Sequence, residues 1–384
     1  MVGVLTVLGI LAYALAGGYL FLATFALLGG ARTLRPPSLS LPEGVSVLVP
    51  LHGSFAGLER CLESLFRQDH PCYELLFGTC DPEDSALATL EEAARRHPKT
   101  PVRVFITPPP PVGTNPKVVN LEALEPHAQH NLLVLIDADI VLETEHLRRV
   151  TAALHDPATG LVTCPYGVEM PARANLWQKL AALYIGDWFY TSVLIGSLVA
   201  PEEHGFGATL ALRRSTLAAA GGLAALRHVL ADDHVLPARV RALGLRTVIL
   251  ESGVKTVVNE TTFRTLWAHE KRWLGTIRAL DPWGYLGLPV GLTSVPLLLG
   301  VVLLGGGAVA WGGFLILAAG RLVLHFLAWN RSRSGRLGAA VLLLPARDFL
   351  TLAEWLAALG ARRLVWSGSP LTIDGRGQLE DNDP

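Results

Sequence analysis

Two aspartates separated by one residue, Asp137 and Asp139, end an apolar stretch of the chain. Charged side chains rarely terminate a buried strand without a partner, and carboxylates are hard oxygen ligands that suit a divalent cation. A cation held there could neutralise the diphosphate of a bound nucleotide. Short acidic pairs also cap helices and turns, so the pattern gains meaning only from its context. We expect Asp137 and Asp139 to bind Mg²⁺ or Mn²⁺ in a nucleotide site.

Further polar motifs precede and follow this pair. Asp81 comes after the apolar run 73–78, Asp233 stands beside Asp232, and the segment HEKRW occupies 269–273. A guanidinium binds phosphate oxygens through two parallel hydrogen bonds, and an aromatic ring can close a nucleotide pocket. Arg272 and Trp273 therefore suit a leaving diphosphate. The same segment also has the apolar spacing of an amphipathic helix at a membrane surface, and both interpretations can hold together.

Other candidates leave two interpretations open. Lys117 follows Asn115 and Pro116 and is either a contact to a bound nucleotide or a solvated lysine in a proline-rich loop. Gly207 belongs to a glycine pair that by itself marks a turn. Asp187 and Trp188 lie in the apolar-aromatic segment 176–199, which is either a lipid-facing wall for an acceptor or a buried or interfacial helix without a substrate role.

The elements that must position these residues form an α/β pattern, because short β-branched runs alternate with helical stretches from 45 to about 281. Strands are predicted at 45–50, 73–78, 102–106 and 131–136, and helices at 55–68 and 84–96. The last strand is apolar on both faces, as a central parallel strand should be. An open sheet of this kind binds ligands beyond the carboxyl ends of its strands, where the polar motifs fall.

Apolar segments flank this pattern on both sides. The uncharged run 2–30 exceeds the roughly 20 residues that cross a bilayer, and it is too long and too poor in N-terminal charge for a cleaved signal peptide. The run 285–329 predicts two spanning helices in a hairpin. Segment 337–360 is interrupted by charges and either spans or lies at the interface.

The expected organisation has five parts. These are an N-terminal membrane helix (1–31), a linker (32–44), a nucleotide-binding domain (45–281), C-terminal membrane helices (282–360) and a tail (361–384). Positive residues favour the cytosolic side, so two basic clusters place the domain in the cytosol with the N-terminus outside. The clusters are Arg32 with Arg35, and Arg331, Arg333 and Arg336.

Composition agrees with a membrane protein. Hydrophobic residues make up 51% of the 384 residues and charged residues 17%, which is unusual for a soluble enzyme. The net charge of -1 argues against a nucleic-acid partner, because phosphate binding needs a clustered cationic face. The four cysteines lack the spacing of a zinc site and are expected to be reduced thiols.

The ordered set of Asp81, the Asp137–Asp139 pair, Asp233 and HEKRW resembles inverting glycosyltransferases that carry D, DxD, D and (Q/R)xxRW in that order. It is most similar to the ceramide glucosyltransferase family and its bacterial hopanoid-biosynthesis relatives. That closer resemblance also rests on 49–53 (VPLHG), 112–117 (VGTNPK) and Arg347-Asp348. His269 departs from the pattern, which has Gln or Arg there.

The resemblance implies a GT-A fold and roles for individual residues. Asp81 would recognise uracil, Asp137 and Asp139 the metal and diphosphate, and Asp233 would be the catalytic base. Chemistry supports the last role, because inversion needs one carboxylate to take the proton of the attacking hydroxyl. Asp232 is the competing candidate. By the same resemblance, Gly207 would lie in a loop beneath the acceptor sugar site.

The sequence therefore predicts a membrane-bound inverting glycosyltransferase that transfers glucose or N-acetylglucosamine from a UDP-sugar to a lipid hydroxyl, hopanoid or ceramide-like. Its partners would be the UDP-sugar, the lipid acceptor and the bilayer, and a bacterial inner membrane is expected. A processive polysaccharide synthase would need more spanning helices to line a channel. An inactive membrane scaffold is disfavoured by the complete set of acidic residues.

Overall fold

The computed structural model describes residues 2–31, 33, 43–200, 204–335, 338–360, 363–366, 369–373 and 379–380. The chain forms two compact units. Unit 1 contains 1–31, 172–198 and 260–370, and unit 2 contains 32–171, 199–259 and 371–384. Residues 172–198 and 260–281, which the sequence prediction assigned to the soluble domain, thus pack in unit 1. Most of the predicted linker, with Arg32 and Arg35, and most of the tail lie outside the described residues, as does Arg336.

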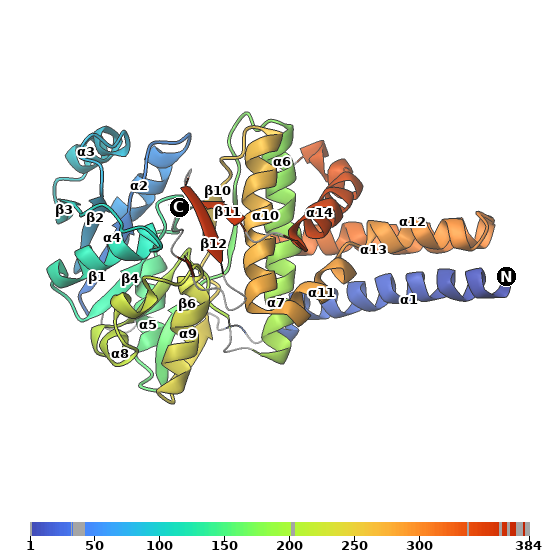
Figure 1. Cartoon of the computed structure of the whole chain (residues 1–384), viewed down its shortest axis with the longest axis horizontal. Helices are drawn as coiled ribbons and strands as arrows, with labels where there is room; N and C mark the ends of the chain where they lie inside the picture. The colour runs from blue at the N-terminus through green and yellow to red at the C-terminus, as the bar shows by residue number, and fades with distance from the viewer. Residues whose placement is uncertain are drawn as a thin grey trace. The chain divides into compact units, whose positions relative to one another are not determined.

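Unit 2 is an α/β fold around a seven-stranded sheet (Figure 1). The strands of this sheet lie in the order β3-β2-β1-β4-β8-β6-β9. Their bounds are Val45–Pro50 (β1), Tyr73–Thr79 (β2), Val102–Ile106 (β3), Leu132–Leu135 (β4), Thr159–Thr163 (β6), Leu210–Arg213 (β8) and Arg246–Ile249 (β9). A second sheet joins β5 (Ile140–Val141), β10 (Val254–Val257) and β7 (Tyr166–Glu169), and two short strands follow at Ser369–Ile373 (β12) and Leu379–Glu380 (β13).

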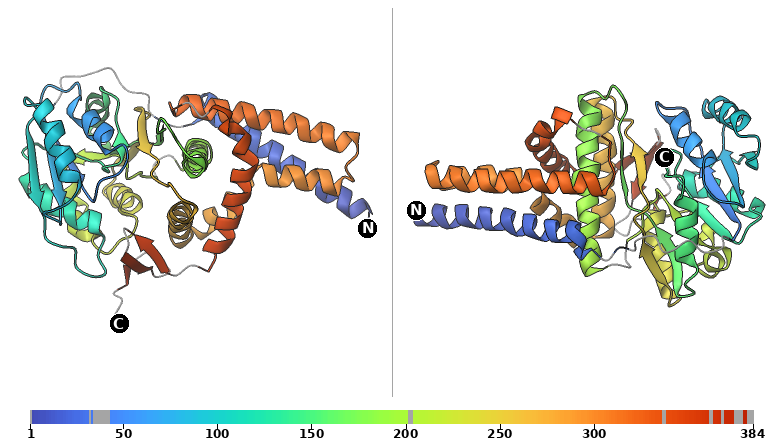
Figure 2. Two further views of the ribbon diagram at one scale, coloured as in Figure 1. Left: turned by 90° about the horizontal axis from the view of Figure 1, so that it is seen from above. Right: turned by 180° about the vertical axis from the view of Figure 1, so that it is seen from behind.

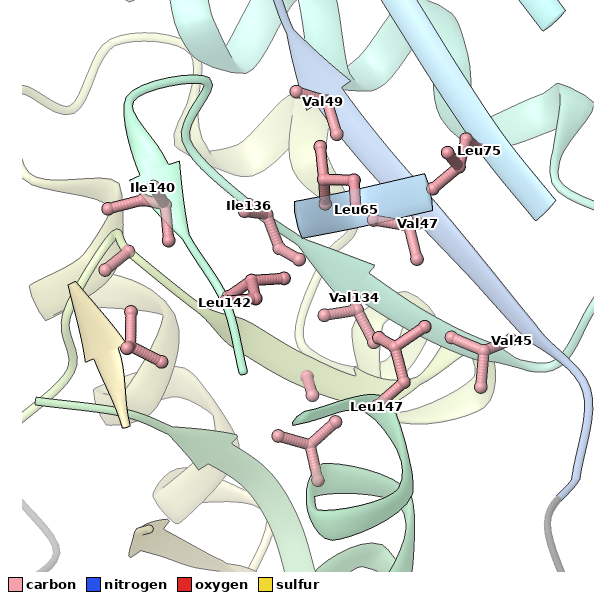
Figure 3. Close-up of a cluster of buried hydrophobic side chains, with 14 of the residues drawn as sticks. Val45, Val47, Val49, Leu65, Leu75, Val134, Ile136, Ile140, Leu142 and Leu147 are labelled. Carbon is pink, nitrogen blue, oxygen red and sulfur yellow. The ribbon is translucent and has the colours of Figure 1, made fainter. Parts of the chain in front are cut away.

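Helices cover both faces of the large sheet. They are α2 (Leu58–Phe66), α3 (Ala86–Arg96), α4 (Pro116–Leu124), η2 (Glu125–His127), α5 (His146–Leu154), α8 (Arg214–Ala219), η4 (Leu223–Leu226) and α9 (Asp232–Ala242). Alternate residues of a strand point to opposite faces, so β1 sends Val45, Val47 and Val49 into one core and Leu48 into the other. Figure 3 shows the first core, where Leu65 of α2 joins the valines of β1. The α/β fold with helices on both faces is confirmed.

The predicted elements match closely, with two instructive differences. The helix predicted at 55–68 begins only at Leu58, because Gly57 takes a left-handed conformation with φ of 105°. β4 pairs in parallel with β1 but antiparallel with β8, so its prediction as a wholly parallel strand is wrong on one side. The run of Leu and Val is explained by burial on both faces, which a mixed sheet also provides.

Unit 1 is helical. Its elements are α1 (Val2–Phe25), η1 (Ala26–Gly30), α6 (Leu176–Leu183), η3 (Tyr184–Phe189), α7 (Tyr190–Val199), α10 (Phe263–Leu280), α11 (Pro282–Gly287), η5 (Leu288–Gly291), α12 (Ser294–Leu303), α13 (Ala308–Arg331), η6 (Gly338–Leu343), α14 (Leu344–Ala358) and the short strand β11 (Arg363–Trp366). Within it, α1 runs beside α12 and α13, and α10 packs against α14 (Figure 1, Figure 2).

Three helices among the described residues are long and apolar enough to cross a membrane, namely Gly3–Gly30, Leu176–Val199 and Ala308–Arg331. The pair Pro282–Gly291 and Ser294–Leu303, bent by 63°, is a fourth possibility. The predicted hairpin at 285–329 thus has one straight and one bent arm. The chain is a membrane protein with apolar helices near both ends.

The helix 176–199 cannot cross the bilayer alone. Strand β8 follows it in sequence but pairs with β4 and β6, which precede it. Likewise β9 pairs with β6 and β10 with β7. A single crossing between them would separate strands that share hydrogen bonds. Its apolar surface is explained by burial instead, since 67% of its most apolar window lies inside the protein.

Candidate active site

Several strands of unit 2 end at one edge of the large sheet. β2 and β4 pair in parallel with β1 on its two sides, so the segments that follow all three strands emerge together. The crevice where neighbouring connections diverge is the usual ligand site of such sheets. Asp137 and Asp139 follow β4, and Asp81 follows β2. The structure therefore brings the predicted acidic motifs to the expected edge.

The N-terminus of α4 delivers Lys117 to this edge. Asn115 caps the helix by accepting hydrogen bonds from the backbone N–H groups of Lys117 and Val118, and Pro116 occupies the first turn. The amide of Asn115 also donates to the carbonyl of Val229, so α4 is fixed to the segment before α9. Sequence reasoning assigned Asn115 no role, although an Asn-Pro pair before an apolar run is a recognisable helix start.

Lys117 is an internal cation of the site. Its Nζ lies 2.8 Å from Oδ1 of Asp137 and 3.3 Å from Oδ2 of Asp232. Its side chain is only 15% exposed, which rules out the solvated lysine. Burial lowers the pKa of Lys117, but Asp137 and Asp232 raise it more, so the ammonium stays charged.

The adjacent acids at the start of α9 differ in their surroundings. Asp232 is buried, pairs with Lys117 and accepts a 3.4 Å hydrogen bond from the amide of Asn115. Asp233 is half-buried, and its Oδ2 accepts a 2.9 Å hydrogen bond from the backbone N–H of Gly207. Burial and the charge of Asp232 raise the pKa of Asp233 to about 6, against the lowering effect of Lys117. A carboxylate tuned toward neutrality is suited to proton transfer, whereas Asp232 is a fixed partner of the lysine.

Glycines let the loop 204–208 approach these carboxylates. A Cβ on Gly207 would lie 3.0 Å from both Oδ2 of Asp137 and Nζ of Lys117, and 3.4 Å from Oδ2 of Asp233. A Cβ on Gly205 would lie 2.0 Å from the backbone oxygen of Asp233. Phe206 between them is held by hydrogen bonds with Thr163 of β6. The glycine pair is therefore more than a turn, because it lines the acidic cluster.

Asp139 and Asp81 lie on the segments that follow β4 and β2. Oδ2 of Asp139 accepts a 3.3 Å hydrogen bond from Thr256 of β10. Asp81 is exposed, and its Oδ1 accepts a hydrogen bond from the backbone N–H of Glu83. Asp84, which sequence reasoning did not select, is buried and accepts hydrogen bonds from Gly53, Thr79 and Ala86. These bonds lower the pKa of Asp84 despite its burial, and the carboxylate joins the loops after β1 and β2.

The acidic pair fits a divalent cation only together with a ligand. Among the described residues no group of three or more His, Cys, Asp or Glu side chains could hold a metal. Mg²⁺ characteristically uses one or two carboxylates and completes its shell with water and substrate phosphates. Asp137 and Asp139 supply hard oxygen donors of that kind, and the side chain of Asp137 is 34% exposed. The donor set is thus compatible with a metal that arrives with a nucleotide.

The structure places the remaining predicted site residues in unit 1. His269, Arg272 and Trp273 lie on α10, where His269 contacts Glu260 through Nδ1. Trp273 lies beside His269, with ring centroids 4.3 Å apart, and stacks on Tyr184 at 5.8 Å. The helix is amphipathic, as the alternative interpretation predicted, with Leu266, Leu274 and Gly275 buried on one face.

Asp187 and Trp188 are both buried in the same unit. Asp187 forms an ion pair with Arg321 of α13 and lies 3.6 Å from Nδ1 of His325. Trp188 packs against Tyr184, with ring centroids 4.8 Å apart. Each of these contacts gives its residue a place in the helical packing, as the alternative without a substrate role predicts.

Arg347 and Asp348, which contributed to the resemblance, are buried on α14. Arg347 bonds to Glu270 of α10 and Glu354 of α14, and its guanidinium lies 5.4 Å from the ring centroid of Tyr184. Asp348 accepts a hydrogen bond from the backbone N–H of Ser294. The pair therefore ties α14 to α10 and α12.

Comparisons with known proteins agree with this architecture. The model of Glycosyl transferase family 21 matches residues 9–379. Ceramide glucosyltransferase 1 of Caenorhabditis elegans is 24% identical over 215 residues, covering 56% of this chain and 45% of that protein. The ceramide glucosyltransferase of Komagataella phaffii is 28% identical over 123 residues, covering 31% of this chain and 24% of that protein. The chain thus spans less than half the length of these relatives.

Among solved structures, the mannosyltransferase PcManGT from Pyrobaculum calidifontis, in complex with GDP-Man and Mn²⁺, is similar in fold. Its TM-score is 0.52 at 17% identity, and the match covers 92% of this chain and 99% of that one. The unit 2 sheet is accordingly a GT-A-like glycosyltransferase fold. The match over nearly the whole sequence shows that the chain belongs to Glycosyl transferase family 21.

Proposed function

We propose that the protein transfers glucose or N-acetylglucosamine from a UDP-sugar to the hydroxyl of a membrane lipid, with inversion at the anomeric carbon. The observation that carries the proposal is Asp233, a half-buried carboxylate with a pKa of about 6 beside Lys117 and Asp137 at the carboxyl edge of the sheet. The relatives named ceramide glucosyltransferase point to a lipid acceptor. A hopanoid or ceramide-like lipid would provide the hydroxyl.

In this reaction Asp233 is the base. The acceptor oxygen forms a bond to the anomeric carbon as the bond from that carbon to the diphosphate oxygen breaks. The acceptor proton passes to Oδ of Asp233, and the UDP leaves with the electron pair. A base works best with a pKa near the working pH, and the surroundings of Asp233 move its pKa in that direction.

The donor would be held by the charged groups around Asp233. Asp137 and Asp139 would bind Mg²⁺ or Mn²⁺, which when bound offsets the negative charge of the diphosphate. Lys117, near the helix start that Asn115 caps and 2.8 Å from Asp137, would contact the donor phosphates. Asp81, exposed after β2, would recognise the uracil. His269, Arg272 and Trp273 would contact the leaving diphosphate and close the donor pocket, with His269 in place of the usual Gln or Arg.

The loop at Gly207 would lie beneath the acceptor sugar site, and its closeness to the proposed base supports this role, because an added Cβ there would lie 3.4 Å from Oδ2 of Asp233. Asp187 and Trp188 would contribute to the acceptor side through the helix that carries them. The competing functions are a processive polysaccharide synthase and an inactive scaffold. The tuned pKa of Asp233 favours an active enzyme, since a scaffold has no need of a carboxyl poised near neutrality.

The proposed location is a bacterial inner membrane, with unit 2 in the cytosol where nucleotide sugars are made. The backbone N–H of Leu379 donates to the carbonyl of His228, so the chain returns to unit 2 after its C-terminal helices. The number of crossings between 259 and 379 must therefore be even. We assign two crossings to the hairpin, so a crossing by α14 would make an odd third, and segment 337–360 would therefore lie at the interface. Arg331 and Arg333 after α13 favour the cytosolic side.

Lipid extracts test the proposal directly. Cells expressing the wild-type chain should accumulate a lipid heavier by one hexose or one N-acetylhexosamine, measured by mass spectrometry. Cells expressing Asp233→Asn should lack it, while Asp156→Asn, which changes an exposed acid paired with Arg246, should retain it. A mass increase by many sugars would favour the processive synthase. An unchanged lipid profile with well-folded protein would support the scaffold.

A further inference from the structure

An apolar pocket with one cationic group at its wall lies inside unit 1. It has a volume of about 250 Å³ and is bounded by α12, α13, η6 and α14. Among the described residues that line it, Ser294 and Arg321 are polar and the others are apolar or proline. The apolar lining includes Leu297, Phe314, Ala318 and Val341.

The guanidinium of Arg321 has N–H groups that are available for further hydrogen bonds. It is 8% exposed, and its Nη2 contacts Asp187 and lies 3.8 Å from Asp348. Its Nε and Nη1 are buried and have no hydrogen-bond partner among the described residues. Buried N–H groups normally find an acceptor, because an unpaired one loses its hydration without compensation. A hydrogen-bond acceptor on a molecule in the pocket would pair with these N–H groups of the guanidinium.

The charges around Arg321 define what kind of acceptor fits. Asp187 and Asp348 place two carboxylates beside one guanidinium, while His325 and the hydroxyl of Tyr19 are the other titratable groups facing this cluster. The positive charge of Arg321 is thus already balanced. An anionic headgroup would meet the two carboxylates, whereas a carbonyl or hydroxyl oxygen accepts a hydrogen bond without adding charge.

We propose that this pocket binds a neutral amphiphile, with its hydrocarbon chain among α12, α13 and η6 and a carbonyl or hydroxyl oxygen on Nε or Nη1 of Arg321. The surrounding helices make a membrane lipid the source of such a molecule, because α13 exposes apolar side chains such as Leu315 and Ile316. This inference does not depend on the proposed sugar transfer. The proposed pocket lies within unit 1 and would bind neutral lipids as a class.

Photolabelling of the full chain in phosphatidylcholine nanodiscs tests the site. The neutral probe is a monoacylglycerol with a diazirine in its acyl chain. Controls are the fatty acid and the plain hydrocarbon of equal length carrying the same diazirine. Peptide mapping by mass spectrometry should find the neutral probe concentrated at 294–298, 314–322 and 341–345. The fatty acid should label less because of its charge, and the hydrocarbon less because it leaves Arg321 unpaired.

Matched substitutions separate the pocket from the outer surface of α13. Ala318→Phe fills the pocket and should lower its labelling at least about tenfold. Ala319→Phe adds the same ring one residue along, at an exposed position outside the pocket lining, and should leave labelling unchanged. Val341→Trp fills the pocket from the side of η6. It is the replacement variant if Ala318→Phe does not fold. Labelling spread evenly over the helices, or unaffected by both filling variants, would overturn the site. Equal or stronger labelling by the fatty acid would overturn the neutral ligand.

Discussion

The pH dependence of the reaction follows from the surroundings of Asp233. With a pKa of about 6, roughly nine-tenths of this carboxyl is ionised at pH 7 and roughly one-tenth at pH 5. With the ordinary value of 3.8, about nine-tenths would still be ionised at pH 5. Only the ionised form accepts a proton. We therefore expect kcat/KM to fall about tenfold per pH unit below pH 6.

The fall of kcat/KM at low pH forms the acid limb of the pH profile. Substitutions of two neighbours of Asp233 should shift this limb in opposite directions. Asp232→Asn removes the negative charge that raises the pKa, so the limb should shift to lower pH. Lys117→Met removes the positive charge that lowers the pKa, so the limb should shift to higher pH. Both substitutions will also reduce the rate, but the limb is read from the shape of the profile. Asp156→Asn should leave the limb in place.

The assay is initial-rate transfer from a radiolabelled UDP-sugar to a lipid acceptor between pH 4.5 and 8. The profile of kcat/KM reports groups of the free enzyme, before donor and metal add their charges. Each sample should be returned to pH 7 afterwards, because recovery of activity excludes acid unfolding. A wild-type profile with no acid limb down to pH 4.5, or shifts of the same sign in the two variants, would refute the assignment of Asp233 as the base.

Four further outcomes are expected. Asp233→Asn should reduce kcat by about 10²–10⁴-fold, while the Kd for UDP, measured by calorimetry, should stay near the wild-type value. Loss of UDP binding would instead indicate that Asp233 binds the donor. Chelation should stop transfer and added Mg²⁺ or Mn²⁺ should restore it, and full activity in chelator with metal content measured as negligible would contradict the proposed ion. Gly205→Ala should impair transfer because its Cβ would meet the backbone of Asp233 at 2.0 Å, whereas Gly287→Ala, with open space around it, should not. Arg347→Leu should destabilise the protein by about 3–5 kcal/mol by leaving Glu270 and Glu354 buried without a cation, and a midpoint of thermal unfolding equal to wild type would show that these acids are neutral.

Much of the fold could be predicted from local pattern. The strands β1 and β3 have the predicted bounds because short β-branched runs flanked by Pro, Gly and polar residues leave few alternatives. The reversed direction of β8 could not be predicted, since strand direction depends on a connection through a whole helix of the other unit. The same applies to segment 176–199, whose apolar composition suits a membrane as well as a protein interior.

The site was predictable in its residue types but not in its pairings. Lys117 and Asp232 are 115 positions apart, and Asn115 reaches Asp232 and Val229 across a similar interval. Sequence spacing carries no information on contacts of that range, so Lys117 remained equally compatible with a solvated loop. Asp187 and Arg321 are a comparable case, with 134 positions between them. An acidic residue in an apolar segment predicts that a partner group lies nearby, but it does not indicate which residue that partner is.

Asp232 and Asp233 have the same side chain, but the fold gives them different neighbours and therefore different proposed roles. Consecutive helical positions point about 100° apart, so the first turn of α9 directs the two carboxylates to different neighbours. Asp232 meets Lys117, and the resulting pair holds a negative charge beside Asp233. Asp233 accepts a hydrogen bond from the N–H of Gly207, which lowers its pKa, but burial and the charge of Asp232 raise the pKa more. The two partners of this ion pair act on the proposed base in opposite directions, because the charge of Asp232 raises the pKa of Asp233 and the charge of Lys117 lowers it. With Asp137 bound to a cation, Lys117 would still have Asp232 as a carboxylate partner.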